Sequence, residues 1–176
     1  MRRLRYGVAM SLDGFIAGPN GEYDWIVIDP AIDFAAIFAQ YDTLLMGRRT
    51  FEIASTRELS TGDLGHQWVV VSRTFNPPPH PNLTVIRGNV ALEVAALKSQ
   101  PGKDIWLFGG GVLFRSLLDA ALVDSVEVTV IPVLLGSGVP LLPEGRRQRL
   151  HLETCKALPS GTLMLNYSVV AKQIEM

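Results

Sequence analysis

The sequence predicts an α/β fold with a mixed, mostly parallel central sheet and antiparallel strands at the C-terminal end. Through about residue 122, apolar runs typical of strands alternate with segments typical of helices, which is the pattern of parallel βαβ units. After that point strands follow one another directly, as in antiparallel pairing. No repeat or linker interrupts this order, so we expect a single domain over residues 1–176.

The first half of the chain is expected to supply two strands and two helices. In order, we expect a strand at residues 4–10, a loop at 13–25, a helix at 29–41, a strand at 43–46 and a helix at 47–54. The loop is rich in Gly, Asn and Pro, and loops of this length usually carry function. Asp29 is a suitable N-cap for the first helix, and Pro30 suits its first position because no backbone N–H is needed there.

The second half is expected to complete the parallel part of the sheet and then to close it. The expected elements are strands at 67–72, 83–87 and 104–108, helices at 91–100 and 112–122, and strands at 123–134, 151–158 and 162–171. Pro132 bends or ends the strand at 123–134, because proline cannot donate to a ladder. Since no helix is expected after residue 122, the last two strands are predicted to form an antiparallel pair.

Composition excludes several classes of function. The formal net charge of -1 provides no basic field for nucleic acid. No apolar run approaches the roughly 20 residues of a membrane span, and the N-terminus lacks a signal-peptide core, so we expect a soluble, cytoplasmic protein. His66, His80 and His151 are scattered, which predicts no metal site. Cys155 is the single cysteine; it fits a reducing compartment, and its apolar neighbours predict a packing role.

Three consecutive glycines lie between two apolar runs in the stretch IWLFGGGVLF, residues 105–114. A glycine inside a strand or helix costs roughly 0.5–1 kcal/mol relative to alanine, so this run indicates backbone that side chains would obstruct. It follows a predicted strand, at the end where parallel sheets bind ligands. One interpretation is a tight turn, since the run does not match the G-x-G-x-x-G pattern. The other is backbone that lies directly against a flat or anionic ligand.

Two further strand ends carry groups that suit phosphate. In LLMGRRT, a predicted strand is followed by Gly47 and then by Arg48 and Arg49 at the start of a helix. The unpaired amides and the dipole of a helix N-terminus favour an anion, and arginine adds a charged fork. In VVVSRT, Ser72 and Arg73 follow a strand in the same way. Each signal also fits an ordinary solvated surface, so the three are informative together rather than singly.

The order GRRT, VSRT and FGGGVLF, with each motif at a strand end, resembles the dihydrofolate reductase superfamily. The opening SLDGFIAGPNGEYDW more specifically resembles the bacterial branch related to the reductase domain of riboflavin biosynthesis. The resemblance extends from Tyr6 to about Val170. It implies the dihydrofolate reductase-like, three-layer α/β/α fold and an NADPH-dependent oxidoreductase.

The resemblance also implies an NADPH site built from these motifs. GRRT corresponds to the turn that binds the pyrophosphate and adenosine phosphate, and Ser-Arg to the pair that holds the 2'-phosphate. The glycines correspond to backbone beneath the nicotinamide, often with a cis peptide. The implied cofactor residues are Ala9, Ile16, Gly47, Arg48, Arg49, Thr50, Ser72, Arg73, Gly109, Gly110, Gly111, Val112 and Leu113. Ala9 and Ile16 also fit an ordinary core, and Arg87 either joins the site or is simply exposed.

Reduction of a substrate requires a proton donor as well as the nicotinamide. In folate reductases the acid lies on the first helix and a threonine supports it; by the resemblance these correspond to Asp33 and Thr129. Asp33 also fits an exposed helix residue. Asp13 is a second candidate on the substrate side, although Asp-Gly is a common turn former. Trp25 and Phe38 are expected to wall the substrate pocket.

The expected function is NADPH-dependent reduction of a small heterocyclic, pteridine- or pyrimidine-like, or carbonyl substrate. One alternative is 5-amino-6-(5-phosphoribosylamino)uracil reductase activity in riboflavin biosynthesis, and another is a non-catalytic NADP(H)-binding sensor. Segment 55–68 lacks the proline-rich, basic turn of the folate enzymes, and no zinc-binding deaminase domain is present. A homodimer is expected, with the apolar run at residues 126–142 as its surface, although that run also fits core strand and loop.

Overall fold

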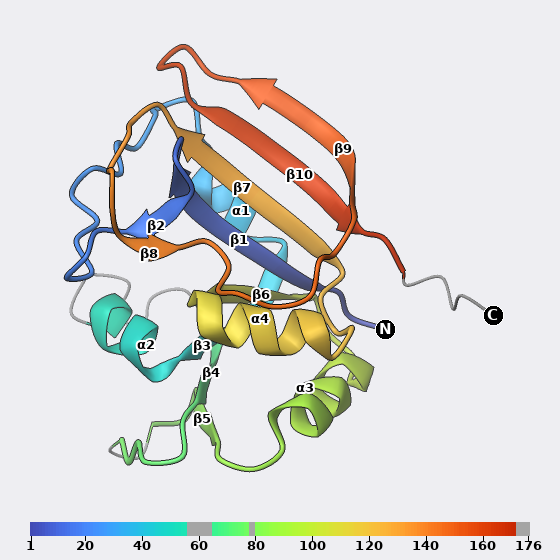
Figure 1. Cartoon of the computed structure of the whole chain (residues 1–176). Helices are drawn as coiled ribbons and strands as arrows, with labels where there is room; N and C mark the ends of the chain where they lie inside the picture. Colours follow the sequence, from blue (N-terminus) through green and yellow to red (C-terminus); the bar gives the residue numbers. More distant parts are fainter. Residues whose placement is uncertain (56–64, 78–79, 172–176) are drawn as a thin grey trace.

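The computed structural model describes residues 1–55, 65–77 and 80–171 and confirms the predicted α/β sheet (Figure 1). Its main strands are β1 (Leu4–Ser11), β3 (Tyr41–Gly47), β4 (Gln67–Val71), β5 (Leu83–Ile86), β6 (Asp104–Gly109), β7 (Ser125–Ile131), β9 (Leu150–Ala157) and β10 (Leu163–Val169). Within these residues they form one eight-stranded sheet in the order β5-β4-β3-β6-β1-β7-β10-β9. Neighbouring strands are parallel except where β10 pairs with β7 and with β9. The predicted antiparallel closure at the C-terminal end is therefore confirmed.

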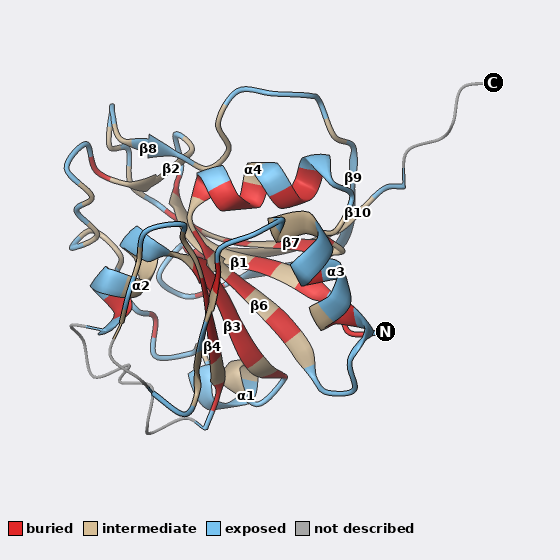
Figure 2. Ribbon diagram, turned by 90° about the horizontal axis from the view of Figure 1, so that it is seen from below, coloured by how far each residue is buried: buried red, intermediate tan, exposed pale blue. Residues whose placement is uncertain are grey.

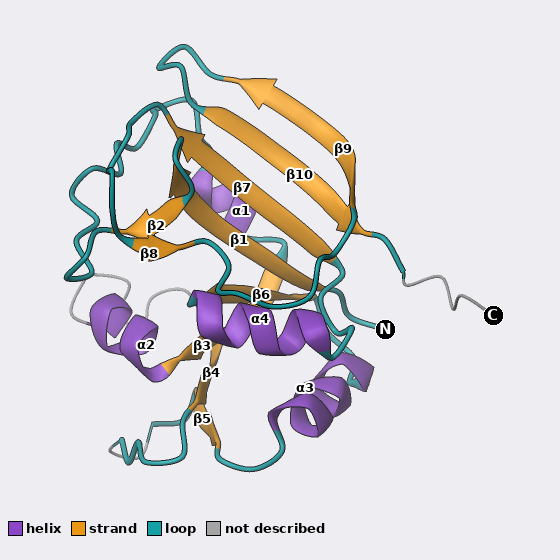
Figure 3. Ribbon diagram, in the orientation of Figure 1, coloured by secondary structure: helices purple, strands orange, loops and turns teal. Residues whose placement is uncertain are grey.

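Two short strands that the sequence did not indicate form a second, two-stranded sheet. β2 (Phe15–Ala17) lies in the loop expected at residues 13–25, and β8 (Val139–Pro140) lies in the loop after β7. They pair antiparallel, which joins these two loops beside the main sheet (Figure 3). Strands of two or three residues are too short to show a period, so sequence patterning does not detect them.

Helices cover both faces of the main sheet and create three layers (Figure 2). One face packs against α3 (Val90–Ser99) and α4 (Gly111–Asp119), and the other against α1 (Phe34–Phe38) and α2 (Arg48–Ser55). Strands covered on both faces are apolar at successive positions, as Leu44, Leu45 and Met46 of β3 are. No helix of the described residues has the length and apolar composition to cross a membrane.

The predicted start of the first helix is wrong. α1 begins at Phe34, and Asp33 is its N-cap, accepting a hydrogen bond from the Ala36 amide at 2.9 Å. Asp29 is buried instead, and its carboxylate accepts hydrogen bonds from the amides of Ala31 at 2.7 Å and Ser160 at 3.2 Å. The bond to Ser160, at the β9–β10 turn, is a tertiary contact that the local sequence around Asp29 does not indicate.

The first part of the predicted dimer surface, residues 126–131, lies in β7, which is an interior strand. β1 and β10 flank β7, so residues 126–131 offer no free edge to a second chain. The homodimer itself stays a prediction. β9 is the strand at that edge of the sheet, and it is exposed along its whole length. The packing role predicted for Cys155 is also wrong, because this residue lies in β9 and is exposed.

Tyr6 provides a test of the core. Its ring stacks on Phe114 with centroids 3.8 Å apart, and its hydroxyl is buried without a hydrogen-bond partner among the described residues. Burial raises the pKa of this phenol well above its usual value. Tyr6→Phe removes the unpaired hydroxyl and keeps the stack, so we expect the free energy of unfolding in urea to rise by about 1 kcal/mol. A fall of similar size would show that the hydroxyl is paired.

Candidate functional site

The carboxyl ends of neighbouring parallel strands bring the predicted motifs together at one edge of the sheet. Gly47 pairs with Val71, directly before Ser72, and the residue before Gly47 pairs with Gly109. On the far side of β4, Val71 pairs with the residue before Arg87. The glycine run, GRRT and VSRT therefore follow one another along β6, β3 and β4, with Arg87 after β5. Open parallel sheets bind ligands at this edge.

The glycine run provides bare backbone beside α2. The peptide bond between Gly109 and Gly110 is cis, as the resemblance implies, and α4 begins at Gly111. The Thr50 hydroxyl oxygen lies 3.4 and 3.6 Å from the positions that Cβ atoms on Gly109 and Gly110 would take. A Cβ on Gly47 would meet only the Gly109 carbonyl oxygen, at 4.0 Å. The space over Gly47 is thus an open cradle, and the Thr50 hydroxyl lies beside the neighbouring glycines.

A cavity of about 390 Å³ lies at the ends of β4 and β5. Ser72, Arg73 and Arg87 contribute to its lining. The Ser72 hydroxyl accepts hydrogen bonds from the amides of Thr74 and Phe75 at 3.4 and 3.2 Å, and Arg87 donates to the Phe75 carbonyl at 2.8 Å. These bonds fix the turn that carries Arg73. Arg73 itself is exposed, so its charge faces solvent beside the cavity.

The two arginines of GRRT differ in their contacts. Arg48 donates to the Glu52 carboxylate at 2.6 Å, and its guanidinium lies 5.7 Å from the centre of the Phe75 ring. Arg49 is exposed and forms no ion pair within the described part of the chain. Among the described residues, Arg49 is therefore the arginine of this pair whose charge is not matched by a carboxylate.

Ala9 and Thr129 lie side by side on the sheet face that α1 and α2 cover. The two residues are register partners in β1 and β7, and both are half-buried. Ile16, in β2, is also half-buried. The side chain of Leu113 belongs to the core, whereas that of Val112 is 78% exposed. Leu113 can therefore contact a cofactor only through its backbone.

The two candidate acids are both committed to backbone amides. Asp33 is exposed and caps α1, and no hydrogen bond joins it to Thr129 among the described residues. Asp13 accepts hydrogen bonds from the Ser11 hydroxyl at 2.6 Å and the Gly136 amide at 2.7 Å. These bonds, that of Ser11 foremost, hold the pKa of Asp13 below its usual value. Asp13 is thus an ionised acceptor at neutral pH.

Trp25 and Phe38, which were predicted to line the substrate pocket, both make contacts within the protein. The Trp25 indole donates to the Glu22 carbonyl at 3.1 Å. Phe38 packs against Trp106, with ring centroids 5.1 Å apart, and is partly buried against the core of its sheet face. Residues 56–64, most of the segment expected to lack the folate-type turn, lie outside the described residues.

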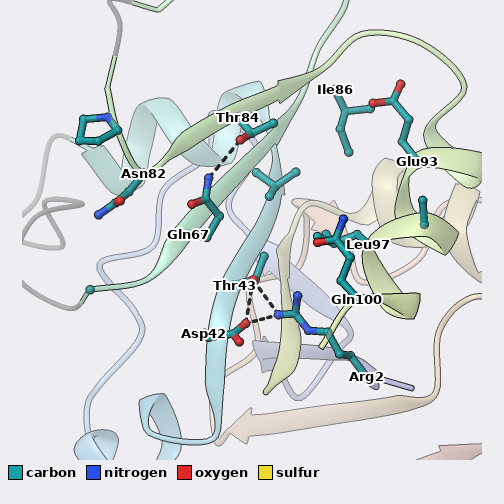
Figure 4. A pocket seen from close by; sticks show the side chains of 14 residues that line it. Arg2, Asp42, Thr43, Gln67, Asn82, Thr84, Ile86, Glu93, Leu97 and Gln100 are labelled. Carbon is teal, nitrogen blue, oxygen red and sulfur yellow. Dashed lines mark hydrogen bonds and ion pairs between the residues drawn. The ribbon is translucent and has the colours of Figure 1, made fainter. Parts of the chain in front are cut away.

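A larger cavity, of about 830 Å³, lies at the opposite end of the strands (Figure 4). It is bounded by α3 and by the amino ends of β3 and β4, where Gln67 donates to Thr84 at 3.0 Å and Arg2 pairs with Asp42. None of the predicted cofactor, catalytic or substrate residues lines this cavity. The motifs therefore mark the carboxyl edge as the candidate site.

Sequence reasoning missed the contribution of the segment after β7. A Cβ on Gly111 would lie 3.2 Å from the Pro140 carbonyl oxygen and 3.1 Å from that of Leu141, so this segment packs directly against the glycine run. Its glycines and prolines mark a loop in the sequence. That composition does not indicate which element the loop packs against.

Residues 2–164 match the family model described as the RibD C-terminal domain. The chain is 35% identical to the uncharacterized protein YyaP of Bacillus subtilis (strain 168), over 94% of each chain. A putative riboflavin biosynthesis protein from Shewanella sp. PV-4 is similar in structure, with a TM-score of 0.83, 24% identity and coverage of 97% of this chain and 100% of that one. Dihydrofolate reductase from Enterococcus faecalis, solved with NADP(H), has a TM-score of 0.69 and 20% identity over 95% and 96% of the two chains.

Two glycine substitutions test the geometry of the cradle. Gly111→Ala places a methyl group against the Leu141 and Pro140 carbonyls, which belong to backbone, so we expect the free energy of unfolding to fall by about 1–3 kcal/mol. Gly47→Ala adds a methyl group to open space, so we expect a change within about 0.5 kcal/mol. Urea denaturation without nucleotide measures both. Equal losses would show that the space over Gly47 is filled.

Proposed function

The chain belongs to the family of the RibD C-terminal domain, and from this membership we propose that it is an NADPH-dependent reductase of a small heterocyclic or carbonyl substrate. The predicted relation to the dihydrofolate reductase-like superfamily is confirmed by the family match and by the structural neighbours. The fold is therefore of the reductase type. The use of NADPH and the reduction of a small heterocyclic or carbonyl substrate are what we propose in addition.

One observation carries the proposal: bare backbone and exposed arginines, without ion pairs among the described residues, meet at the same edge of the sheet. The open space over Gly47, with Gly109 beside it, suits a pyrophosphate and a flat ring that need close approach to backbone. Arg73, beside the cavity of about 390 Å³, suits a 2'-phosphate. Arg49 provides a further exposed guanidinium at the start of α2. These features favour NADPH over NADH.

When bound, NADPH supplies the hydride. The chain supplies orientation: Ala9 leaves room beside β1, where a larger side chain would occupy the space next to the ring. Thr129 is the polar neighbour of Ala9, so its hydroxyl can hold substrate or an ordered water. We assign proton delivery to water held by Thr129, because the Asp33 carboxylate is already bonded to the Ala36 amide; Asp33 remains the alternative donor.

Arg5 and Lys156 are cations on the sheet face that carries Ala9 and Thr129. Arg5 points to the same face of β1 as Gly7 and Ala9, which lie two and four residues further along the strand. Its guanidinium donates to Glu127 at 2.6 and 2.9 Å and to Asp104 at 3.3 Å. A phosphoribosyl substrate would need a cation on this face. The charge of Arg5 is already matched, whereas Lys156, in register with Thr129 through Met164, is exposed and forms no ion pair among the described residues. Family membership makes 5-amino-6-(5-phosphoribosylamino)uracil reduction the alternative to test.

Titration of the purified protein with NADPH and NADH, followed by nicotinamide fluorescence, tests the cofactor. We expect NADPH to bind more tightly. Dihydrofolate and a ribosylamino-pyrimidine, with and without its phosphate, are then added separately to the NADPH complex, and oxidation is followed by absorbance. Oxidation by one compound identifies the substrate class. Tight binding without turnover by any of them would favour the sensor, and no binding of either nucleotide would contradict the proposal.

Arg73→Ala tests the contact with the 2'-phosphate. A hydrogen bond to a charged group is worth about 1.5–3 kcal/mol, so we expect the Kd for NADPH to rise by roughly tenfold to a hundredfold and that for NADH to stay unchanged. Arg146→Ala, which removes an exposed arginine outside the site, is the matched control for loss of charge. Equal weakening of both nucleotides by Arg73→Ala would show that Arg73 does not bind the 2'-phosphate.

A further inference from the structure

The Asp13 carboxylate joins two segments that lie 122 residues apart in the sequence. Both of its oxygens lie 3.1 Å from the Leu135 amide nitrogen, and one accepts from the Gly136 amide at 2.7 Å. The Ser11 hydroxyl donates to the other oxygen at 2.6 Å. Donors of the chain itself therefore occupy both oxygens, which suits a structural junction rather than proton transfer to a substrate.

The residues on either side of Asp13 strengthen the same junction. The Leu12 amide donates to the Val133 carbonyl at 2.9 Å. Gly14 has a φ of +91°, a conformation that side chains disfavour, and its carbonyl accepts from the Leu141 amide at 2.9 Å. The turn SLDG thus binds the segment after β7 both near its start and near its end.

We call residues 133–143 the strap. β8 lies within the strap and pairs with β2, the short strand that carries Ile16 (Figure 1). Beyond β8, the carbonyl oxygens of Pro140 and Leu141 come within about 3 Å of the space beside Gly111, at 3.2 and 3.1 Å from a Cβ built there. The strap therefore connects two predicted nicotinamide contacts, Ile16 and Gly111, that belong to different parts of the chain.

The strap is fastened at both of its ends. Arg115, in α4, donates to the Pro143 carbonyl at 3.2 and 3.0 Å, and Asp13 holds the opposite end. We propose that Asp13 is a positioning residue, which fixes the strap so that Ile16 and the start of α4 enclose the nicotinamide end of the cofactor. This inference rests on the proposed function. The adenosine end, at Ser72 and Arg73, has no contact with the strap among the hydrogen bonds of the described residues.

The test separates the two ends of the cofactor. NADPH reaches both ends of the site, whereas 2',5'-ADP reaches only the adenosine end. For Asp13→Ala we expect the Kd for NADPH to rise about tenfold, because an opened junction leaves only a fraction of the molecules competent to enclose the nicotinamide end, and that for 2',5'-ADP to stay unchanged. Asp13→Asn keeps one acceptor oxygen and should give a smaller rise. Asp24→Asn, which alters an exposed aspartate of the same loop, is the matched control and should change neither.

Hydrogen exchange on the protein without nucleotide provides a second readout. Amides of the strap should exchange faster in both Asp13 variants and not in Asp24→Asn. An equal rise in the Kd values for NADPH and 2',5'-ADP would show that Asp13 has only a structural role. An unchanged Kd for NADPH together with faster exchange of the strap amides would overturn the positioning role. If the unaltered protein binds neither NADPH nor 2',5'-ADP, the proposed function fails, and the inference fails with it. If the unaltered protein binds NADPH, the proposed function stands, and the Asp13 variants test the inference alone.

Discussion

The position of β6 between β3 and β1 is the constraint on which the site depends. Ile105 and Leu107 of β6 are fully buried, so packing on both sides fixes the course of this strand. Its last residue is Gly109, and the glycine run consequently emerges in the middle of the carboxyl edge, next to Gly47 at the end of β3. Side chains at either glycine would fill the space that a ligand needs. The site is therefore built first from backbone, and charged side chains are added around it.

The sequence contained enough information for the sheet and for the part of the site that follows strand ends. The parallel strands appear in the sequence as apolar runs, and the motifs GRRT, VSRT and GGG follow three of them. Alternation of strands and helices predicts parallel strands, which puts these motifs at one edge of the sheet. The strand order, in which β6 lies next to β3 and β4 next to β5, is seen only in the structure and places GRRT beside the glycines and Ser72 beside Arg87. The cofactor residues named from sequence that depend on backbone position are accordingly brought to one edge.

The parts that sequence could not supply depend on tertiary contacts between distant loops. Asp29 fits the local pattern of an N-cap, but it accepts a hydrogen bond from Ser160 at a distant turn, and Asp33 caps the helix. Asp13 reads as a turn former, yet its partners Leu135 and Gly136 lie in a loop whose course no local pattern indicates. Cys155 has the neighbours of a core residue because alternation in β9 and in a covered strand look alike. Whether a strand is buried depends on the elements that pack against it, and the sequence of the strand alone does not show this.

The exposed edge at β9 has a consequence for solubility. An edge strand presents unpaired N–H and C=O groups that can template growth of the sheet by other chains, and Leu150 and Leu152 make this one apolar on one face. Two features oppose such growth. The register with β10 shifts along the strand, which interrupts a flat edge, and Glu153 and Lys156 place charges on it. The register shift and the two charges disfavour extended pairing along this edge, whereas a single neighbour whose shape and charge match it can still pair there.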